Sequence, residues 1–241
     1  DGLISYAKKG EWLEVPLHFI RSGHAPQEER TDVSDALRHL GIPERLIRKL
    51  RAGGGIRLSG NRLSLRLFPE EQDGTVPEWH DLQVLYEDDF TLVVHKPAGM
   101  PVHPVRSDQQ GTLANAVASY YDCTGQCCKI RHIHRLDEDT TGPVLYAKHE
   151  FSQVKLDEAM RLKKIGRTYA AVVHGVMKER AGTIRLPIGR DRHHPVRRRV
   201  SRTGAPAVTH YETLESYRSY SLVRLRLETG RTHQIRVHLS H

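Results

Sequence analysis

The sequence lacks the features that mark secreted, membrane-spanning and disordered proteins. It has only three cysteines, an odd number that argues against a disulfide framework. No apolar run approaches the roughly 18 residues of a membrane span, and no apolar stretch follows a basic N-terminus as in a signal peptide. With 38% hydrophobic and 27% charged residues, the composition fits neither a disordered nor a collagen-like chain. We therefore expect a soluble, cytoplasmic and monomeric protein with no membrane partner.

The cysteines are too few for a zinc ribbon as well. Cys123, Cys127 and Cys128 lie close together, but a four-ligand zinc site needs one more ligand, and the second half of a ribbon is missing. Free thiols in a loop are the simpler interpretation. Because the chain starts at Asp1 instead of Met, we expect that it has been trimmed, and a removed leader stays open.

What the sequence has in excess is positive charge. Lys and Arg outnumber Asp and Glu by 37 to 29, giving a net charge of +8, so a polyanion such as nucleic acid is the expected partner. Seven arginines fall within one short stretch: Arg185, Arg190, Arg192, Arg197, Arg198, Arg199 and Arg202. Such crowding predicts either a flexible loop that grips phosphates or a disordered basic loop without a specific ligand.

The chain divides into two parts of different texture. Residues 1–75 comprise a strand-like segment at 12–20, a polar stretch at 21–32, two short helices at 34–50, a β-hairpin at 56–68 and a linker. The helices are interrupted at Gly41 and Pro43, and basic residues line the second one. We expect a small α/β-hairpin module here, followed by a separate domain over residues 80–241.

The second part is rich in strands. We expect strands at 82–86, 91–95, 144–147, 168–173, 208–214 and 220–228, with helices starting after Thr112 and at Glu150. Because strands and helices do not alternate regularly, a mixed α+β fold is favoured over a doubly wound one.

Two polar clusters could carry chemistry. In the first, His132 to Gly142, Asp137 lies in a turn-forming stretch; a carboxylate of ordinary pKa is ionised at neutral pH and needs only an arginine nearby to remain so. In the second, Glu228 to His238, Arg231 and Arg236 follow a glycine turn, where one guanidinium could contact a phosphate and the other a buried carboxylate. A structural turn and a solvated basic turn are the alternatives.

Four ordered motifs resemble those of the RluA-type pseudouridine synthases. The opening motif is contained in 84–104, around His95-Lys96-Pro97, and the catalytic motif is His134-Arg135-Leu136-Asp137 with Thr140-Thr141-Gly142. Segments 167–175 and 229–238 resemble the two later motifs. The resemblance covers about residues 82–241, and four motifs in order are far more specific than one. The module at 33–68 loosely resembles the small RNA-binding domain that precedes many members.

The resemblance implies conversion of uridine in RNA to its carbon-linked isomer, without cofactor or metal. Asp137 matches the essential aspartate, which either attacks the sugar or abstracts a sugar proton; Arg236 matches its basic partner, and Tyr169 the aromatic residue that stacks on the base. Extrusion of the uridine from the stack is required. The implied substrate contacts are His134, Arg135, Thr140, Arg231, Gln234 and Lys96.

The same resemblance implies a mixed, mainly antiparallel sheet with flanking helices and a central cleft. Ribosomal RNA is the expected substrate, and transfer RNA is the second choice. Two positions depart from the family pattern, since Thr141 replaces a serine and Arg167 a common lysine, and both keep the functional group. The family domain normally continues beyond His241, so the catalytic domain is expected to be truncated there.

Three other functions remain as alternatives. A non-catalytic RNA-binding protein would use the basic surface but has no need for Asp137 beside phosphates. A metal-dependent hydrolase could be built on the histidines His132, His134, His233 and His238, although His233 and His238 have a poor ligand spacing for a helix. A glycosidase would need two separated carboxylates, whereas only Asp137 has a plausible set of partners.

Overall fold

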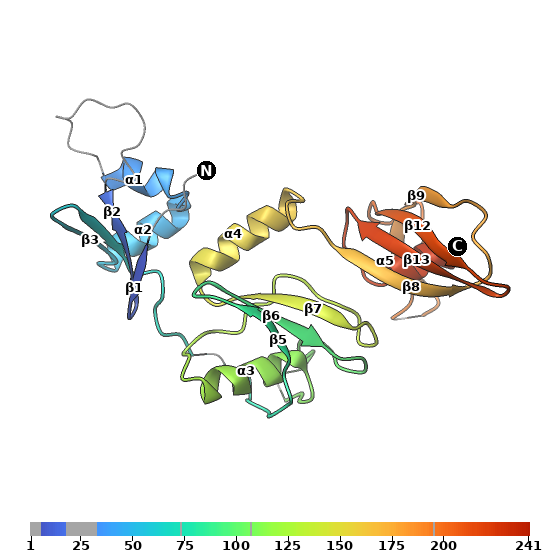
Figure 1. The fold of residues 1–241 in the computed structure, drawn as a ribbon, viewed down its shortest axis with the longest axis horizontal. Helices are drawn as coiled ribbons and strands as arrows, with labels where there is room; N and C mark the ends of the chain where they lie inside the picture. The colour runs from blue at the N-terminus through green and yellow to red at the C-terminus, as the bar shows by residue number, and fades with distance from the viewer. Residues whose placement is uncertain (1–5, 18–32, 73, 107, 195) are drawn as a thin grey trace. The chain divides into compact units, whose positions relative to one another are not determined.

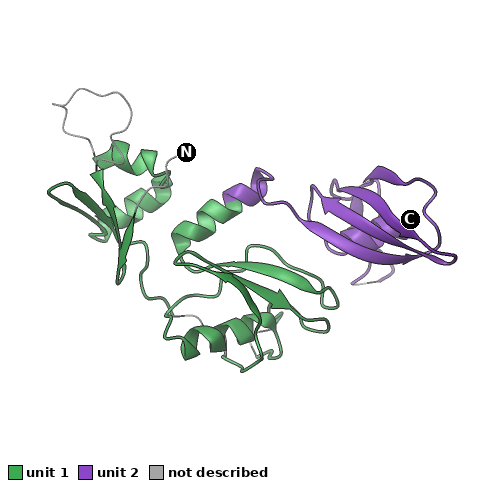
Figure 2. Cartoon of the chain, viewed as in Figure 1, with its two compact units in different colours: residues 1–157 green, residues 158–241 purple. Residues whose placement is uncertain are grey.

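The computed structural model describes residues 6–17, 33–72, 74–106, 108–194 and 196–241. The chain forms two compact units, residues 1–157 and residues 158–241 (Figure 2). Within the described ranges, no helix is both long and apolar enough to cross a lipid bilayer. The boundary between the units falls inside the region for which sequence predicts one catalytic domain, and the division at 75–80 stays a prediction.

Unit 1 begins with a four-stranded antiparallel sheet and two short helices (Figure 1). Its elements are β1 (Ala7–Lys9), β2 (Trp12–Pro16), α1 (Val33–His39), α2 (Glu44–Ala52), β3 (Ile56–Ser59) and β4 (Arg62–Leu65). The predicted break between the helices is confirmed: Gly41 has a φ of +65°, which suits glycine, and the extended Pro43 precedes α2. Beyond Leu17, the predicted strand to Ile20 and the polar stretch 21–32 lie outside the described residues.

The core of this first part extends beyond the module. Buried leucines of both helices and of β2 and β4 form it, among them Leu37, Leu46 and Leu63. Phe90 and Phe151, from later in the chain, pack against the same cluster, and the rings of Phe68 and Phe90 lie 5.2 Å apart. The module is therefore joined to the rest of unit 1 by apolar contacts as well as by the linker.

The second part of unit 1 is a three-stranded antiparallel sheet of order β5-β6-β7 with helix α3 and most of helix α4, whose last turn belongs to unit 2 (Figure 1). The elements are β5 (Val84–Glu87), β6 (Thr91–Lys96), α3 (Leu113–Cys123), β7 (Gly142–Ala147) and α4 (Glu150–Arg161). The predicted cap of α3 is confirmed: the Thr112 hydroxyl accepts a hydrogen bond from the Asn115 amide, and the Asn115 side chain accepts one from the Thr112 amide. All three cysteines are free thiols, as expected.

Unit 2 is built on a four-stranded antiparallel sheet of order β8-β13-β12-β9 (Figure 1). Its elements are β8 (Thr168–His174), β9 (Ala181–Arg185), β10 (Ile188–Arg190), β11 (Arg198–Val200), β12 (Val208–Ser216), β13 (Tyr220–Leu227) and α5 (Gln234–Leu239). Val223 and Leu225 are buried on one face of β13, while Arg224 and Arg226 are exposed on the other, which confirms the predicted alternation.

The arginine-rich stretch is more ordered than the sequence predicts. Strands β10 and β11 pair as an antiparallel hairpin, where a flexible or disordered loop was expected. The reason is a small apolar cluster beneath it, in which Ile188, Ala207 and Val237 are buried and Val200 packs against them. The arginines project from a supported hairpin instead of a loop.

The predicted fold class is confirmed, since the protein is α+β with antiparallel sheets. Every pair of strands in the described parts of the chain is antiparallel. The strands are divided among four sheets, where the sequence predicted one main sheet after the module. The central cleft stays a prediction.

Candidate active site

Asp137 lies on a loop whose two ends are fixed to the same strand. Before the loop, the Ile133 amide donates to the Leu145 carbonyl at 2.8 Å, and the Ala147 amide donates to the Arg131 carbonyl at 2.9 Å. After the loop, β7 begins at Gly142, whose φ of +130° suits glycine. Residues 131–133 thus run beside β7, and the intervening residues form a closed loop.

Inside this loop, Leu136 and Asp137 have different environments. Leu136 packs against the buried cluster of the β5-β6-β7 sheet, whereas the next residue, Asp137, is half-buried at the surface. The Thr140 amide donates to the Asp137 carbonyl at 3.0 Å, which closes a turn. Leu136 therefore anchors the segment, and the turn presents the Asp137 side chain.

Lys96 is the main polar support of this loop. Its side chain is fully buried, and its ammonium donates to the carbonyls of Pro97 at 2.8 Å, Met100 at 2.6 Å and Glu138 at 2.6 Å. Burial lowers the pKa of Lys96, and the charges of Asp139, Glu138 and Asp137 oppose that shift. One cation thus joins the opening motif to the residue after Asp137. The substrate contact predicted for Lys96 stays a prediction, and these contacts favour a positioning role.

His103 and His132 form a second connection between the two motifs. Their rings stack with centroids 4.9 Å apart and an interplanar angle of 19°. Burial lowers the pKa of His132 to about 4, with contributions from His103, Arg135 and His134, and burial also lowers the pKa of His103. Both imidazoles are therefore neutral at pH 7, which lets them stack without charge repulsion. His103 lies in the opening motif and His132 in the first polar cluster, but nothing in the sequence indicates that their rings would stack.

The remaining predicted residues of the catalytic motif lie on the same loop. The His134 ring nitrogen Nε2 accepts a hydrogen bond from the Leu145 amide at 3.3 Å, which ties His134 to β7. Arg135 is exposed, and Thr140 is half-buried in the turn. The structure thus brings His134, Arg135, Asp137 and Thr140 together in one short loop of unit 1, with the Lys96 ammonium at the carbonyl of Glu138.

In unit 2, Gln234 supports the second cluster. The side chain of Gln234 is buried; its amide nitrogen donates to the Val208 carbonyl and the Thr209 hydroxyl, each at 3.0 Å. Its amide oxygen accepts from the Thr229 hydroxyl at 2.8 Å and the Arg231 amide at 3.0 Å. Gln234 therefore shapes the turn that precedes α5, and its predicted substrate contact stays a prediction.

The two arginines of this cluster remain at the surface. Arg231 is exposed and donates from Nε to the Pro206 carbonyl at 3.1 Å, and Arg236 is exposed on α5. His233, immediately before the helix, has a φ of +58°, a conformation that few residues other than glycine adopt. Tyr169 is half-buried on β8, opposite Leu225 of β13.

Sequence reasoning missed a charged cluster at the start of unit 2. Glu228 pairs with Lys163 at 2.8 Å and with His210 at 2.6 Å, and these two partners lower the pKa of Glu228 to about 2. Gly230 leaves room for Arg167, because a Cβ at this position would lie 2.4 Å from the Arg167 guanidinium. The signal available in the sequence was the glycine itself, which lies inside the motif at 229–238.

The predicted catalytic residues are thus divided between the two units. Asp137 belongs to unit 1, and Tyr169 and Arg236 belong to unit 2. The ion pair of Asp137 with Arg236 stays a prediction. No group of three or more His, Cys, Asp or Glu side chains that could hold a metal ion occurs among the described residues. His238, one histidine of the hydrolase alternative, is buried and hydrogen-bonded to Thr209 and the Leu186 carbonyl.

Comparison with known proteins agrees with the motifs. The family model described as RNA pseudouridylate synthase matches residues 90–241. A Bacillus subtilis protein named uncharacterized RNA pseudouridine synthase YhcT is 40% identical over 242 residues, which cover 99% of this chain and 77% of that protein. Ribosomal large subunit pseudouridine synthase D of Haemophilus influenzae is 40% identical over 184 residues. That match covers 76% of this chain but only 56% of the relative.

A solved structure gives the same result. Human RNA pseudouridylate synthase domain containing 4 superimposes with a TM-score of 0.54 at 30% identity, covering 66% of this chain and 63% of that one. The matched family region contains both the Asp137 loop and the Glu228–His238 cluster. The chain therefore belongs to the RNA pseudouridylate synthase family, whose members are isomerases that act on RNA.

Proposed function

We propose that this protein isomerises specific uridines in RNA to pseudouridine and that Asp137 is the essential carboxylate. The observation that carries the proposal is the construction of the Asp137 loop, which is fixed at both ends to β7, anchored by Leu136 and held by the Lys96 ammonium at the Glu138 carbonyl. A group that must meet one sugar atom needs such support, because small misplacements cost large factors in rate. Whether Asp137 attacks the sugar or removes a proton is left open.

The target uridine leaves the stack before reaction, and three further side chains receive it. Tyr169 offers a ring on which the extruded base stacks, Arg236 supplies the positive charge that keeps Asp137 ionised, and Arg135 holds the RNA after extrusion. Extrusion is required because an enzyme that acts on the sugar and on both edges of a base cannot reach them inside a helix. Arg231, His134 and Thr140 complete the contacts to the nucleotide.

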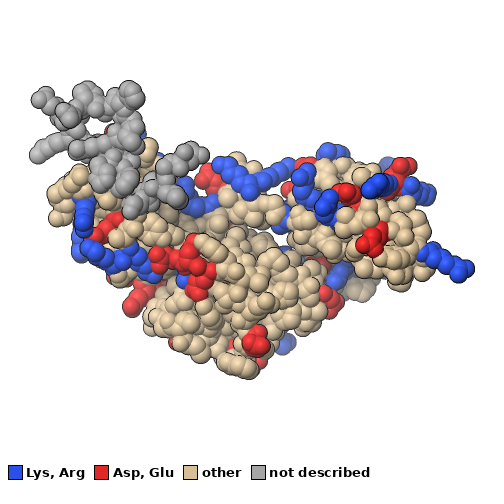
Figure 3. Space-filling view, in the orientation of Figure 1, with Lys and Arg blue, Asp and Glu red and all other residues tan. Residues whose placement is uncertain are grey.

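Ribosomal RNA is the proposed substrate. Three relatives of about 40% identity are named as ribosomal large subunit pseudouridine synthases, and a transfer RNA is the second candidate. We propose that the protein acts as a monomer in the cytoplasm, where such RNA is made and modified. Figure 3 shows Lys and Arg side chains spread over the visible face of both units with acidic ones between them, so overall charge does not locate the RNA.

The hairpin of β10 and β11 is the proposed phosphate contact of unit 2. Six of the seven arginines between 185 and 202 are exposed, and the hairpin rests on the cluster of Ile188, Ala207 and Val237. In unit 1, the exposed Arg45 and Arg48 of α2 make the module a second contact. Such contacts give affinity that falls with salt and carry little sequence information.

The test uses RNA labelled with tritium at carbon 5 of uridine, from which pseudouridine formation releases the label. Asp137→Asn keeps the size of the side chain and should still bind RNA while releasing no label. Undiminished release would refute the assignment of Asp137, and release in excess chelator would dispose of the metal hydrolase. Mapping the pseudouridines of ribosomal and transfer RNA by mass spectrometry, in cells with and without the protein, identifies the substrate.

A further inference from the structure

The sheet of unit 2 has an outer face whose side chains are exposed. On β8, Val172 and His174 lie on this face, opposite Leu222 and Tyr220 of β13. Val172 is 70% exposed and Tyr220 is 41% exposed, so neighbouring apolar and aromatic side chains of the two paired strands are open to solvent. This face therefore has the composition of a contact surface.

An aromatic pair stands at one end of that face. The turn between β12 and β13 brings Tyr217 against Tyr220, with ring centroids 4.5 Å apart and an interplanar angle of 21°. The turn is closed by the Tyr217 amide, which donates to the Tyr220 carbonyl at 2.9 Å, and the Tyr217 hydroxyl also donates to Glu215. The Tyr220 ring is thus held in one orientation although it is partly exposed.

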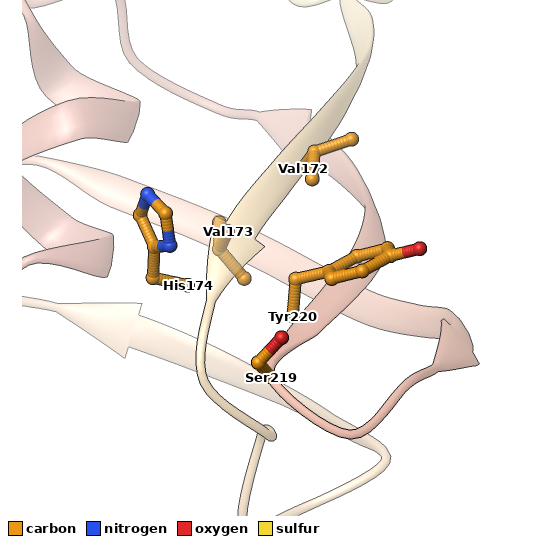
Figure 4. Close-up of a pocket in the computed structure, with 5 residues that line it drawn as sticks. All are labelled: Val172, Val173, His174, Ser219 and Tyr220. Atoms are coloured by element: carbon orange, nitrogen blue, oxygen red, sulfur yellow. The ribbon is translucent and has the colours of Figure 1, made fainter.

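Beside this ring is a shallow concavity of about 250 Å³ (Figure 4). Its lining residues are Val172, Val173, His174, Ser219 and Tyr220. Figure 4 shows the Tyr220 ring beside Val172, while Ser219 lies below it. Sites for drug-sized ligands typically measure roughly 300–1,000 Å³, so this concavity suits a single planar ring system.

The charges around the concavity favour an anionic ligand. Arg218 is exposed in the turn itself, and Arg224 and Arg226 are exposed further along the same face of β13. Glu212 pairs with Arg224, so these two charges offset each other, and Arg218 and Arg226 together outweigh the negative charge of Glu215, which accepts from Tyr217. A planar ring attached to a phosphate matches this surface, and this is the chemistry of a nucleotide.

The site is separate from the proposed reaction centre. Tyr169 pairs with Leu225, five residues along β13 from Tyr220, or roughly 17 Å at about 3.4 Å per residue. Tyr220 is the first residue of β13, and the Glu228–His238 cluster begins just after the last residue of this strand. The base that binds here is therefore not the uridine that reacts.

We propose that this end of the sheet binds one unpaired nucleotide of the substrate RNA, with its base stacked on Tyr220 and its phosphate on Arg218. Single-stranded RNA is commonly bound in this way, by aromatic side chains on an open antiparallel sheet beside basic ones. The inference rests on the proposed function for the identity of the ligand as RNA, and it adds where a nucleotide flanking the target would be held.

The experiment measures the affinity of a fluorescein-labelled, unstructured RNA oligonucleotide by anisotropy. Tyr220→Ala removes one base-to-aromatic stack and should therefore weaken RNA binding roughly 5- to 150-fold. Tyr220→Phe keeps the ring and should bind like the wild type, and Tyr86→Ala removes an exposed tyrosine of unit 1 as a matched control. Arg218→Ala should lower the slope of log affinity against log salt by about 0.7.

Location is tested with RNA containing 4-thiouridine, which should cross-link to a peptide that includes Tyr220. Wild-type affinity for Tyr220→Ala, or cross-links confined to other peptides, would overturn the proposal. The proposal would also be overturned if Tyr220→Ala changed the sedimentation coefficient of the protein but not its affinity for RNA. The exposed face would then contact a second copy of the chain. Failure of the proposed function is distinguishable, because it would appear as absence of tritium release by the wild-type chain.

Discussion

The two units solve the same problem with different side chains. In unit 1 the charged ammonium of Lys96 holds the Asp137 loop through three carbonyls, and in unit 2 the neutral amide of Gln234 holds the Arg231 turn through four hydrogen bonds. Burying a charge is costly unless its hydrogen bonds are complete, whereas a neutral amide can lose one partner at modest cost. The support in unit 1 is therefore expected to be the less tolerant of substitution.

The largest effect is expected from Lys96→Met. The carbonyls of Pro97, Met100 and Glu138 would lose their shared donor, and we expect a loss of about 3 kcal/mol in the free energy of unfolding, or about 6–12 °C in Tm. Tritium release per folded molecule should also fall, because the Asp137 loop loses its support. Thermal denaturation and release are measured on the same preparation.

The matched control is Lys148→Met, since Lys148 is also buried and bridges Glu87 and the Asp88 carbonyl, away from the catalytic loop. It should lower Tm without changing release per folded molecule. If Lys96→Met left Tm unchanged and raised only KM, Lys96 would be a substrate contact and the comparison between the units would fail.

A smaller effect is expected from Gln234→Leu. The substitution removes the hydrogen bonds of one neutral amide and should cost about 1–2 kcal/mol of unfolding free energy, less than Lys96→Met. Chemical denaturation followed by circular dichroism measures this loss of unfolding free energy. An effect as large as that of Lys96→Met would show that charge is not what distinguishes the two supports.

At neutral pH the smallest effect is expected from the His103–His132 stack, because its contribution to stability changes only as pH falls below about 6.5. The pKa of His132 is lowered from 6.5 to about 4, so between these values the unfolded chain binds more protons than the folded one. Stability from this histidine is therefore present above pH 6.5 and is lost as pH falls toward 4, by at most about 1.4 kcal/mol per pH unit. His132→Gln should reduce the slope of unfolding free energy against pH in this window.

His149 provides a matched control for His132. Burial lowers the pKa of His149 to about 4 as well, but its ring contacts Phe68 instead of a histidine. His149→Gln should change the slope of stability with pH but leave tritium release unaffected. His132→Gln should lower tritium release as well, because the His103–His132 stack connects the two motifs. Equal losses of release in both variants would contradict a special role of this stack in supporting the Asp137 loop.

Much of the local structure could be predicted from the sequence because it depends on neighbouring residues. Gly41 and Pro43 mark the break between helices, Thr112 marks the start of α3, and the alternation in β13 gives its buried face. The roles of Lys96 and Gln234 could not be predicted, since the direction of a long side chain depends on contacts distant in sequence. The hairpin at 188–200 could not be predicted, because the crowded arginines indicate a loop, whereas the apolar residues that support the hairpin, Ala207 and Val237, are distant in sequence.

The apolar contact between Phe68 and Phe90 affects how this protein can be shortened. Phe90 and Phe151 lie against the leucines of the module, so cutting the chain after Pro69 would strip the cover from both rings. The shortened protein would then expose an apolar patch where the module had been, and exposed apolar patches promote aggregation. Gain or loss of the module during evolution would accordingly require polar replacements at these two phenylalanines.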